Sequence, residues 1–441
     1  MSNSEKPRNR NQWVHSPDIR NILVNRWPSL RLLSDKPELP AAPLLLEILE
    51  CAHSASLTRE EGRTIAFRLL LVPSLPGLAR ICSEHGMTLV GFDQPRDLTA
   101  QELRRLAPAT DPSTTMIVIE FDNPPGAGRL SIRGLTSIGS EWREFNAGRR
   151  LSGTLPPSLL MVSVSGPGSV RFECAGLPII GMEQGRLLSD AQNVLRQGPV
   201  SEFLLPALME YSGKNLNPSD WSEFYGATSN YLRFLAWVLH LCRDQQHGGM
   251  FLLLRRSADA RGLVTIKYPC RFEEPWRLLL KVEDCLREAF AQGQQEAESL
   301  KKRRQLDSAY REAEDVAHLI ARLASVDGCV VLNDRLDVLG FGAIVAPGTD
   351  AVPEEIFVCS EPTGEAAEGH KADGYGTRHR SAFRVCAATE DALAFVLSQD
   401  GGVKAITRRG SRVLVFENVA LDGRAWSSSP PLEDIFRKQG G

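Results

Sequence analysis

Two short segments of the sequence, about fifty residues apart, carry residue types that suit phosphate chemistry. The first is Asp327-Gly328, at the end of a helix-like stretch, and the second is Gly376–Arg380, with the sequence Gly-Thr-Arg-His-Arg at the start of another. A helix start offers unpaired N–H groups and a positive dipole end to an anion. A carboxylate near a triphosphate can hold Mg²⁺ or Mn²⁺ and help to ionise an attacking hydroxyl. The two segments therefore predict a phosphate site with an acidic partner.

Each residue of the second segment contributes differently to such a site. Gly376 permits a close backbone approach, Thr377 offers a hydroxyl, and Arg378 and Arg380 carry planar, permanently charged groups that match phosphate oxygens. The alternative is that two exposed arginines only solvate a helix end, and that Asp327 only ends a helix, as Asp-Gly pairs commonly do. Cations at a helix start oppose its dipole, so the arrangement is favourable only with a bound anion. That favours a site.

The elements around these segments predict one mixed sheet with helices packed on it. Apolar, β-branched runs predict strands, and Thr377 is the expected N-cap of a helix over 377–384, after a polar loop over 360–376. The predicted strands cover 329–332, 336–345, 355–359, 392–397, 403–407 and 413–416.

The stretch from Trp276 to Ala324 lacks proline and is rich in Glu, Gln, Lys, Arg, Ala and Leu, which predicts a long helix, interrupted near Gly293. Its expected apolar face is Val316, Leu319, Ile320 and Leu323, at helical spacing. The basic run 301–304 fits a solvated helix face among glutamates better than a nucleic-acid patch. We expect residues 276–310 to connect an N-terminal domain to a domain over 311–421.

The region over 31–275 alternates helix-like and strand-like runs, which predicts an α/β domain. Residues 1–30 and 422–441 are polar and are expected to be a flexible lead-in and a tail. The more legible predictions are a helix over 98–106 with Thr99 as N-cap, a strand over 115–121, a hairpin of 158–165 with 169–173, a helix over 230–242 and a strand over 250–254.

Composition excludes several classes of protein. With 42% hydrophobic and 24% charged residues the chain is not wholly disordered, and a net charge of -3 gives no global attraction to nucleic acid or a membrane. The nine cysteines form no C-x-x-C pair, which favours a reducing, cytoplasmic setting. The sequence contains no Walker A loop, no zinc-type histidine spacing and no G-x-S-x-G nucleophile motif. Any anion site must therefore be local.

Three segments in order resemble the diadenylate cyclase (DAC) domain of DisA-type proteins. They are 323–332, which contains Asp-Gly, 376–382, which contains Arg-His-Arg, and 397–402, which stands where the family has a Ser-Glu-Glu-type stretch. The resemblance covers about residues 310–420. The region before it, including His247–Leu252 after a helix, is similar to the N-terminal sensor regions of the DACNV type that are fused to such cyclases.

The resemblance implies an α/β fold, with a mixed sheet flanked by helices, preceded by a sensor domain and a long connecting helix. It implies facing DAC domains in a homodimer or higher homo-oligomer, each holding one ATP, with each 3′-hydroxyl attacking the other α-phosphate to give cyclic di-AMP and two pyrophosphates. Asp327 matches the hydroxyl-activating aspartate that binds Mg²⁺ or Mn²⁺, with Asp400 as a second metal ligand. The remaining matches are ATP-binding residues: Gly328, Thr377, Arg378, His379, Arg380 and Ser398.

Two positions depart from the family pattern. Cys329 replaces the usual alanine, which is a change from one small residue to another. Gln399-Asp400 replaces an acidic pair and leaves Asp400 as its one carboxylate, so the sequence does not determine the metal affinity or the reaction rate. The alternative to a cyclase is a DAC-like module that senses a nucleotide without turning it over. The effector of the N-terminal domain is unknown.

Overall fold

The structure is a computed structural model of the 441-residue chain. It describes residues 14–29, 37–60, 63–112, 114–123, 128–139, 159–174, 177–187, 192–213, 221–245, 247–258, 262–289, 296–346, 352–398 and 402–421.

The chain divides into two compact units, Met1–Asp190 and Ala191–Gly441. The sequence placed the main boundary near residue 275, so the observed division differs from the expected one. The reason is β11 (Gly249–Leu254), which the sequence assigned to the N-terminal domain. It pairs with β14 (Cys329–Asn333) and β18 (Ala392–Leu397) in the middle of the second sheet. The second unit therefore includes residues well before 311.

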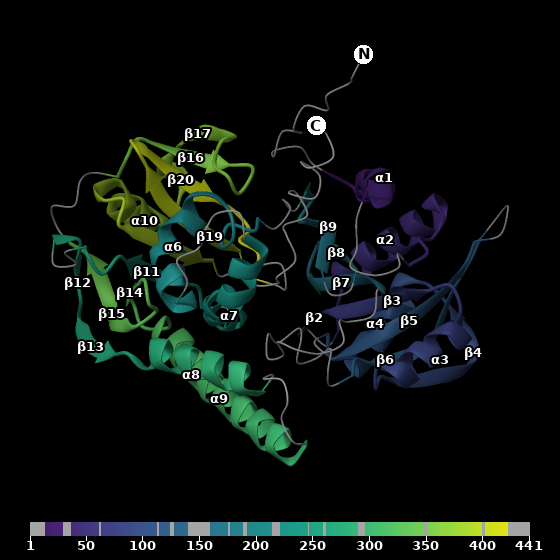
Figure 1. Cartoon of the computed structure of the whole chain (residues 1–441). Helices are drawn as coiled ribbons and strands as arrows, with labels where there is room; N and C mark the ends of the chain where they lie inside the picture. Colours follow the sequence, from purple (N-terminus) through teal and green to yellow (C-terminus); the bar gives the residue numbers. More distant parts are fainter. Residues whose placement is uncertain are drawn as a thin grey trace, which may run out of the picture. The chain divides into compact units, whose positions relative to one another are not determined.

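The first unit is built on an eight-stranded mixed sheet with the order β10-β9-β8-β7-β3-β5-β6-β4 (Figure 1). The pair β3–β5 is parallel and the other neighbours are antiparallel. The strands are β3 (Phe67–Val72), β4 (Thr88–Asp97), β5 (Thr115–Asp122), β6 (Arg129–Ser137), β7 (Leu160–Gly166), β8 (Ser169–Cys174), β9 (Leu177–Glu183) and β10 (Arg186–Leu187), beside a small hairpin of β1 (Arg59–Glu60) and β2 (Arg63–Thr64).

Helices pack on both faces of this sheet. One apolar core gathers side chains from α1, α2, α4 and one face of the strands, and a smaller core lies under α3 on the opposite face. The bounds are α1 (Ser16–Arg26), α2 (Ala42–Ser56), α3 (Leu75–Glu84) and α4 (Ala100–Leu106), with short 3₁₀ turns at Trp27–Ser29 and Ala107–Ala109.

The flexible lead-in expected over residues 1–30 contains a helix, α1. Ile19 and Leu23 of α1 are buried in the larger core of the first unit, so the helix is part of that unit. The prediction for the α4 region is confirmed: the Thr99 hydroxyl accepts a hydrogen bond from the Glu102 N–H at 3.1 Å. The strand from Thr115 and the β7–β8 hairpin are also confirmed.

The second unit is built on a ten-stranded mixed sheet with the order β12-β15-β14-β11-β18-β19-β20-β16-β17, in which β13 also pairs with β15. The expected loop over 360–376 contains one of these strands, β17. The remaining bounds are β12 (Val264–Thr265), β13 (Tyr268–Phe272), β15 (Val338–Val345), β16 (Glu355–Cys359), β17 (Ala367–Lys371), β19 (Val403–Arg409) and β20 (Arg412–Phe416).

The second unit has three layers. Phe251 and Leu253 of β11 face one core, which also contains side chains of α6–α9, whereas Leu252 faces the opposite core, which contains Phe383 of α10. This alternation is the period of two of a strand buried on both faces. The helices are α6 (Gly198–Ser212), α7 (Trp221–Asp244), α8 (Glu274–Ala289), α9 (Glu296–Leu323) and α10 (Thr377–Ala388), with a 3₁₀ turn at Ala372–Gly374 before α10.

The long helix predicted over 276–324 is two helices, α8 and α9, and Gly293 lies outside the described residues. Both pack into the core of the second unit, so the expected connector over 276–310 belongs to that unit. The buried face of α9 also differs from the predicted one. Ile320 is buried, but Leu319 is 48% exposed, and the other buried hydrophobic positions of the helix are Leu306 and the alanines at 309, 313, 317 and 321. Small side chains allow the close approach of α8 and α7.

No helix within the described ranges combines the length and the apolar composition that a membrane span requires.

Candidate functional site

The candidate site lies where several strand ends of the second sheet meet. β11 and β14 run parallel, and β18 runs antiparallel to β11, with Gly249 opposite Leu397. The starts of β11 and β14 and the end of β18 therefore lie at one edge of the sheet. The topology thus brings Asp327-Gly328, just before β14, close to Ser398, just after β18.

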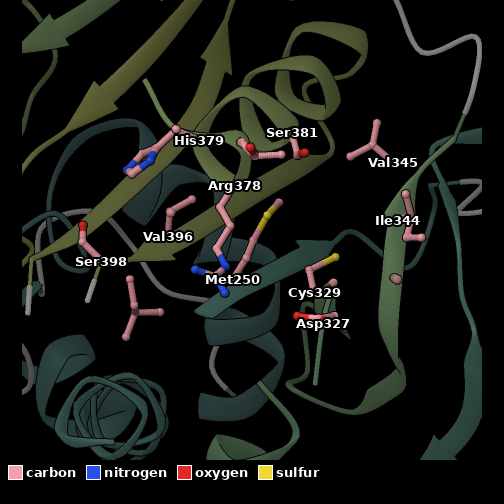
Figure 2. A pocket seen from close by; sticks show the side chains of 15 residues that line it. Met250, Asp327, Cys329, Ile344, Val345, Arg378, His379, Ser381, Val396 and Ser398 are labelled. Atoms are coloured by element: carbon pink, nitrogen blue, oxygen red, sulfur yellow. The ribbon is translucent and has the colours of Figure 1, made fainter. Parts of the chain in front are cut away.

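A cavity of about 480 Å³ opens at this edge, on the face of the sheet that α10 covers (Figure 2). It collects most of the residues that the sequence singled out, together with an apolar wall. Its described lining residues are Met250, Asp327, Gly328, Cys329, Ala343, Ile344, Val345, Gly376, Thr377, Arg378, His379, Ser381, Val396, Leu397 and Ser398.

Gly328 is required by the backbone. Its φ of 110° lies in the region that favours glycine, and a Cβ there would lie 2.6 Å from the Gly342 carbonyl carbon and 2.7 Å from the Ala343 carbonyl oxygen. Both are backbone atoms, so no side-chain rotation could relieve the clash. Gly328 thus lets the chain turn tightly into β14 and leaves the Asp327 side chain exposed at the cavity.

The N-terminus of α10 forms another side of the cavity. The N-cap is Gly376, one residue before the expected Thr377, and Thr377 is the first residue of the helix. The Gly376 carbonyl accepts the Arg380 N–H at 3.1 Å, as the first intrahelical bond. The N–H groups of the first turn have no intrahelical acceptor, and Thr377 and Arg378 are exposed. This end of the helix can bind an anion.

Arg378 brings a positive charge into the cavity. In Figure 2 its side chain runs from α10 toward Met250 and the side on which Asp327 lies. The charge also reaches Cys242 of α7: burial raises the pKa of that thiol to about 11, and Arg378 acts against this rise. Arg378, which is itself exposed, therefore supplies this cavity with a guanidinium group that can meet an anion.

His379 lines the side of the cavity nearer Ser398 (Figure 2). Its ring lies against Tyr375, with 5.6 Å between ring centroids, and Tyr375 in turn packs edge-on against Phe383 at 5.2 Å. The Lys404 ammonium lies 5.4 Å from the Tyr375 ring centroid and pairs with Glu417 at 2.5 Å. Tyr375, which the sequence did not single out, thus packs against His379 without being among the lining residues of the cavity.

The predicted site residues do not all converge. Asp327, Gly328, Thr377, Arg378, His379 and Ser398 line the cavity, whereas Arg380 is exposed and is not among its lining residues. Asp400 and its neighbour Gln399 lie outside the described residues. The apolar wall, which includes Met250 and Ile344, was not predicted as part of the site.

Cys329 closes the back of the cavity as a protonated thiol. Burial raises its pKa to about 12, so it is neutral at physiological pH and not nucleophilic. It thus serves as a small apolar residue of the cavity wall.

In the part of the chain that the structure describes, no three His, Cys, Asp or Glu side chains gather in a way that could hold a metal ion without help from a ligand. Asp327 is the one carboxylate among the described lining residues.

Comparison with known proteins identifies the N-terminal region. Residues 34–137 match the family described as "Probable sensor domain DACNV". A DACNV sensor domain is therefore present, within the first unit, and it includes α2–α4 and β3–β6. No curated protein matches the chain.

Proposed function

We propose that the second unit is a diadenylate cyclase that binds ATP in the cavity beside α10 and is regulated by the DACNV domain. The observation that carries this proposal is the convergence of Asp327-Gly328 and the first turn of α10 on one cavity of about 480 Å³. These segments are far apart in sequence and carry the Asp-Gly and Arg-His-Arg motifs in the order of DAC domains. The volume lies in the range of small-molecule pockets.

Arg378 and the α10 N-terminus would bind the triphosphate. The helix N–H groups and the guanidinium fork neutralise phosphate charge, including the charge that develops on the leaving pyrophosphate. Apolar side chains such as Met250 and Ile344 offer a surface for the nucleoside, and Ile344 is 66% exposed. Phosphoryl transfer needs mainly such positioning and charge neutralisation.

The reaction joins two nucleotides. The 3′-hydroxyl oxygen of each ATP bonds to the α-phosphorus of the other, the bond to the bridging oxygen of pyrophosphate breaks, and the hydroxyl loses its proton. The negative charge of Asp327, exposed at the cavity, favours that loss. Because each nucleotide needs a partner opposite it, two copies of the chain would have to face each other.

The donor set at this site fits Mg²⁺ or Mn²⁺. Mg²⁺ typically binds through one or two carboxylates and substrate phosphates and keeps several waters, so a single carboxylate beside a triphosphate suffices. Asp327 would hold the ion. When bound, the ion would add positive charge that stabilises the phosphoryl transition state.

A second function is nucleotide binding without turnover. It is favoured by the single carboxylate among the described lining residues, because two-metal phosphoryl transfer uses more acidic ligands. The presence of Asp327 at the cavity favours the cyclase. A protein that only binds a nucleotide needs no carboxylate beside the phosphates, because like charges repel.

The test is to incubate the full chain with ATP and Mn²⁺ and to search for cyclic di-AMP by mass spectrometry over a dilution series. The cyclase predicts cyclic di-AMP, with activity per subunit falling through the range in which the dimer dissociates. Saturable ATP binding with no cyclic product would support the binder. Constant activity down to a monomeric protein would contradict the facing arrangement.

A further inference from the structure

One row of the first sheet places two arginines on either side of a serine, on three neighbouring strands. Arg68 of β3 is directly opposite Ser163 of β7, and Ser163 is directly opposite Arg171 of β8. The residue opposite Arg171 on β9 is Gly181, which has no side chain to fill the adjacent space.

The three side chains lie on the face of the sheet that carries α3. On each strand the flanking residues, for example Phe67 and Leu69 or Val162 and Val164, belong to the larger core on the opposite face. Successive strand residues point to opposite faces, so Arg68, Ser163 and Arg171 share the other one. The next row on that face, which includes Met161, is covered by α3 in the smaller core.

Neither arginine has a protein partner among the described residues. No ion pair or hydrogen bond joins the guanidinium of Arg68 or Arg171 to a described side chain, and this includes Glu173, two residues beyond Arg171 on the same face. Arg68 is half-buried and Arg171 is exposed. Between them, the Ser163 Oγ is buried and has no hydrogen-bond partner among the described residues. A buried hydroxyl without a partner is costly, and natural structures usually satisfy it.

The spacing suits a shared anion. Neighbouring strands are about 4.8 Å apart, so the Cα atoms of the two arginines are roughly 10 Å apart, with Ser163 midway. Two long arginine side chains can converge over that distance, and guanidinium groups bind tetrahedral oxyanions in a two-pronged manner. A hydroxyl between them supplies a third donor.

We propose that Arg68, Ser163 and Arg171 form an effector site for a phosphate-bearing small molecule in the first unit. The site begins within the matched DACNV region at Arg68 and extends beyond it to β7 and β8. The ligand of the sensor domain would then be a small molecule that carries phosphate. This proposal does not depend on whether the second unit is a cyclase.

The probe is inorganic phosphate, observed by broadening of its ³¹P signal as it is titrated into the full chain at constant ionic strength. Arg378→Ala serves as the background, so that phosphate held by the α10 cavity does not contribute. The site predicts saturable binding that weakens at least about tenfold in Arg68→Gln and in Arg171→Gln, as the loss of charge-assisted hydrogen bonds requires. Arg80→Gln, an exposed arginine on α3, is the matched control and leaves the affinity unchanged.

Ser163→Ala separates a ligand role from a structural one. Its hydroxyl has no partner in the described protein, so the variant keeps the parent Tm in the absence of phosphate and weakens phosphate binding several-fold. Absence of saturable binding, or the same affinity in all variants, would overturn the site. Acetate binding as tightly as phosphate would overturn the assignment of a phosphate-bearing ligand.

Discussion

The two units differ in where they leave polar groups accessible. In the ten-stranded sheet of the second unit, helices cover both faces, and the cavity opens at strand ends, next to the first turn of α10. In the eight-stranded sheet of the first unit, α3 covers only part of one face, and arginines remain on the same face beside it. Strand ends bring backbone turns and helix termini together, and this arrangement suits a site for reacting phosphates. A sheet face holds side chains at fixed spacing, and this arrangement suits the recognition of a ligand.

The largest expected effect is on Asp327. Asp327→Asn should reduce cyclic di-AMP formation by more than about a hundredfold, because it removes the charge that favours ionisation of the hydroxyl and holds the ion. The change keeps the size of an exposed side chain, so Tm should stay within about 2 °C of the parent. Product is measured by mass spectrometry, with Asp315→Asn, an exposed position on α9, as the control. Equal turnover by parent and variant would remove Asp327 from the mechanism.

The next effect separates two neighbouring arginines. Arg378→Ala should weaken ATP binding about ten- to a hundredfold, because it loses charge-assisted hydrogen bonds worth roughly 1.5–3 kcal/mol. Arg380 lies outside the cavity lining, so Arg380→Ala should weaken binding much less. Fluorescent ATP-analogue titration measures both. Equal losses would mean that Arg380 also reaches the nucleotide, as the sequence motif predicted.

Backbone geometry gives a third effect, this time on stability. Gly328→Ala should lower the free energy of unfolding by about 1–3 kcal/mol, since φ is 110° and the new Cβ would meet two backbone groups. Gly374→Ala, where an added Cβ has nothing within 4 Å, is the control and should change it by less than about 0.5 kcal/mol. Urea denaturation measures both. An unaffected Gly328→Ala would show that the turn before β14 is not tight.

The smallest effect concerns pH. Burial alone would raise the pKa of Glu210, but hydrogen bonds from Arg335 and Arg256 outweigh it and lower that pKa below its usual range. A lowered carboxyl pKa stabilises the fold above the unfolded value, about 4.3, and this contribution is lost as the pH falls through the folded value. The Tm difference between parent and Glu210→Gln should therefore be present at pH 7 and shrink below pH 4. Glu84→Gln, at an exposed ion pair of the first unit, should show no such difference. A Glu210→Gln difference that stays constant with pH would contradict stabilisation by the ionised carboxylate.

Local patterns predicted much of the fold. Alternating and continuous apolar runs located β5, β14 and β18, and the Thr99 and Glu102 spacing located α4, because each signal depends on a few adjacent residues. The unit boundary could not be found in this way. The place of β11 between β14 and β18 depends on pairing across more than seventy residues, which periodicity does not contain.

The candidate site was likewise predictable where local sequence signals mark it and not elsewhere. Charge and glycine content marked Asp327-Gly328 and the α10 N-terminus, and the structure brings them to one cavity. The apolar wall was missed because Met250 and Ile344 have the composition of ordinary strand residues. Arg380 shows the opposite error: it follows Arg378 by two residues, and a helical rotation of about 200° over two residues turns it away from the cavity lining.

Site-resolved hydrogen–deuterium exchange of the full chain, with and without ATP and Mg²⁺, shows directly whether the second unit binds the nucleotide. Binding in the cavity beside α10 predicts slower exchange at the Asp327–Cys329 turn, the first turn of α10 and the end of β18, and the same protection in the Arg171→Gln variant. Fast exchange at all three segments with saturating ATP, or protection confined to the first unit, would contradict a nucleotide site at this edge of the second sheet.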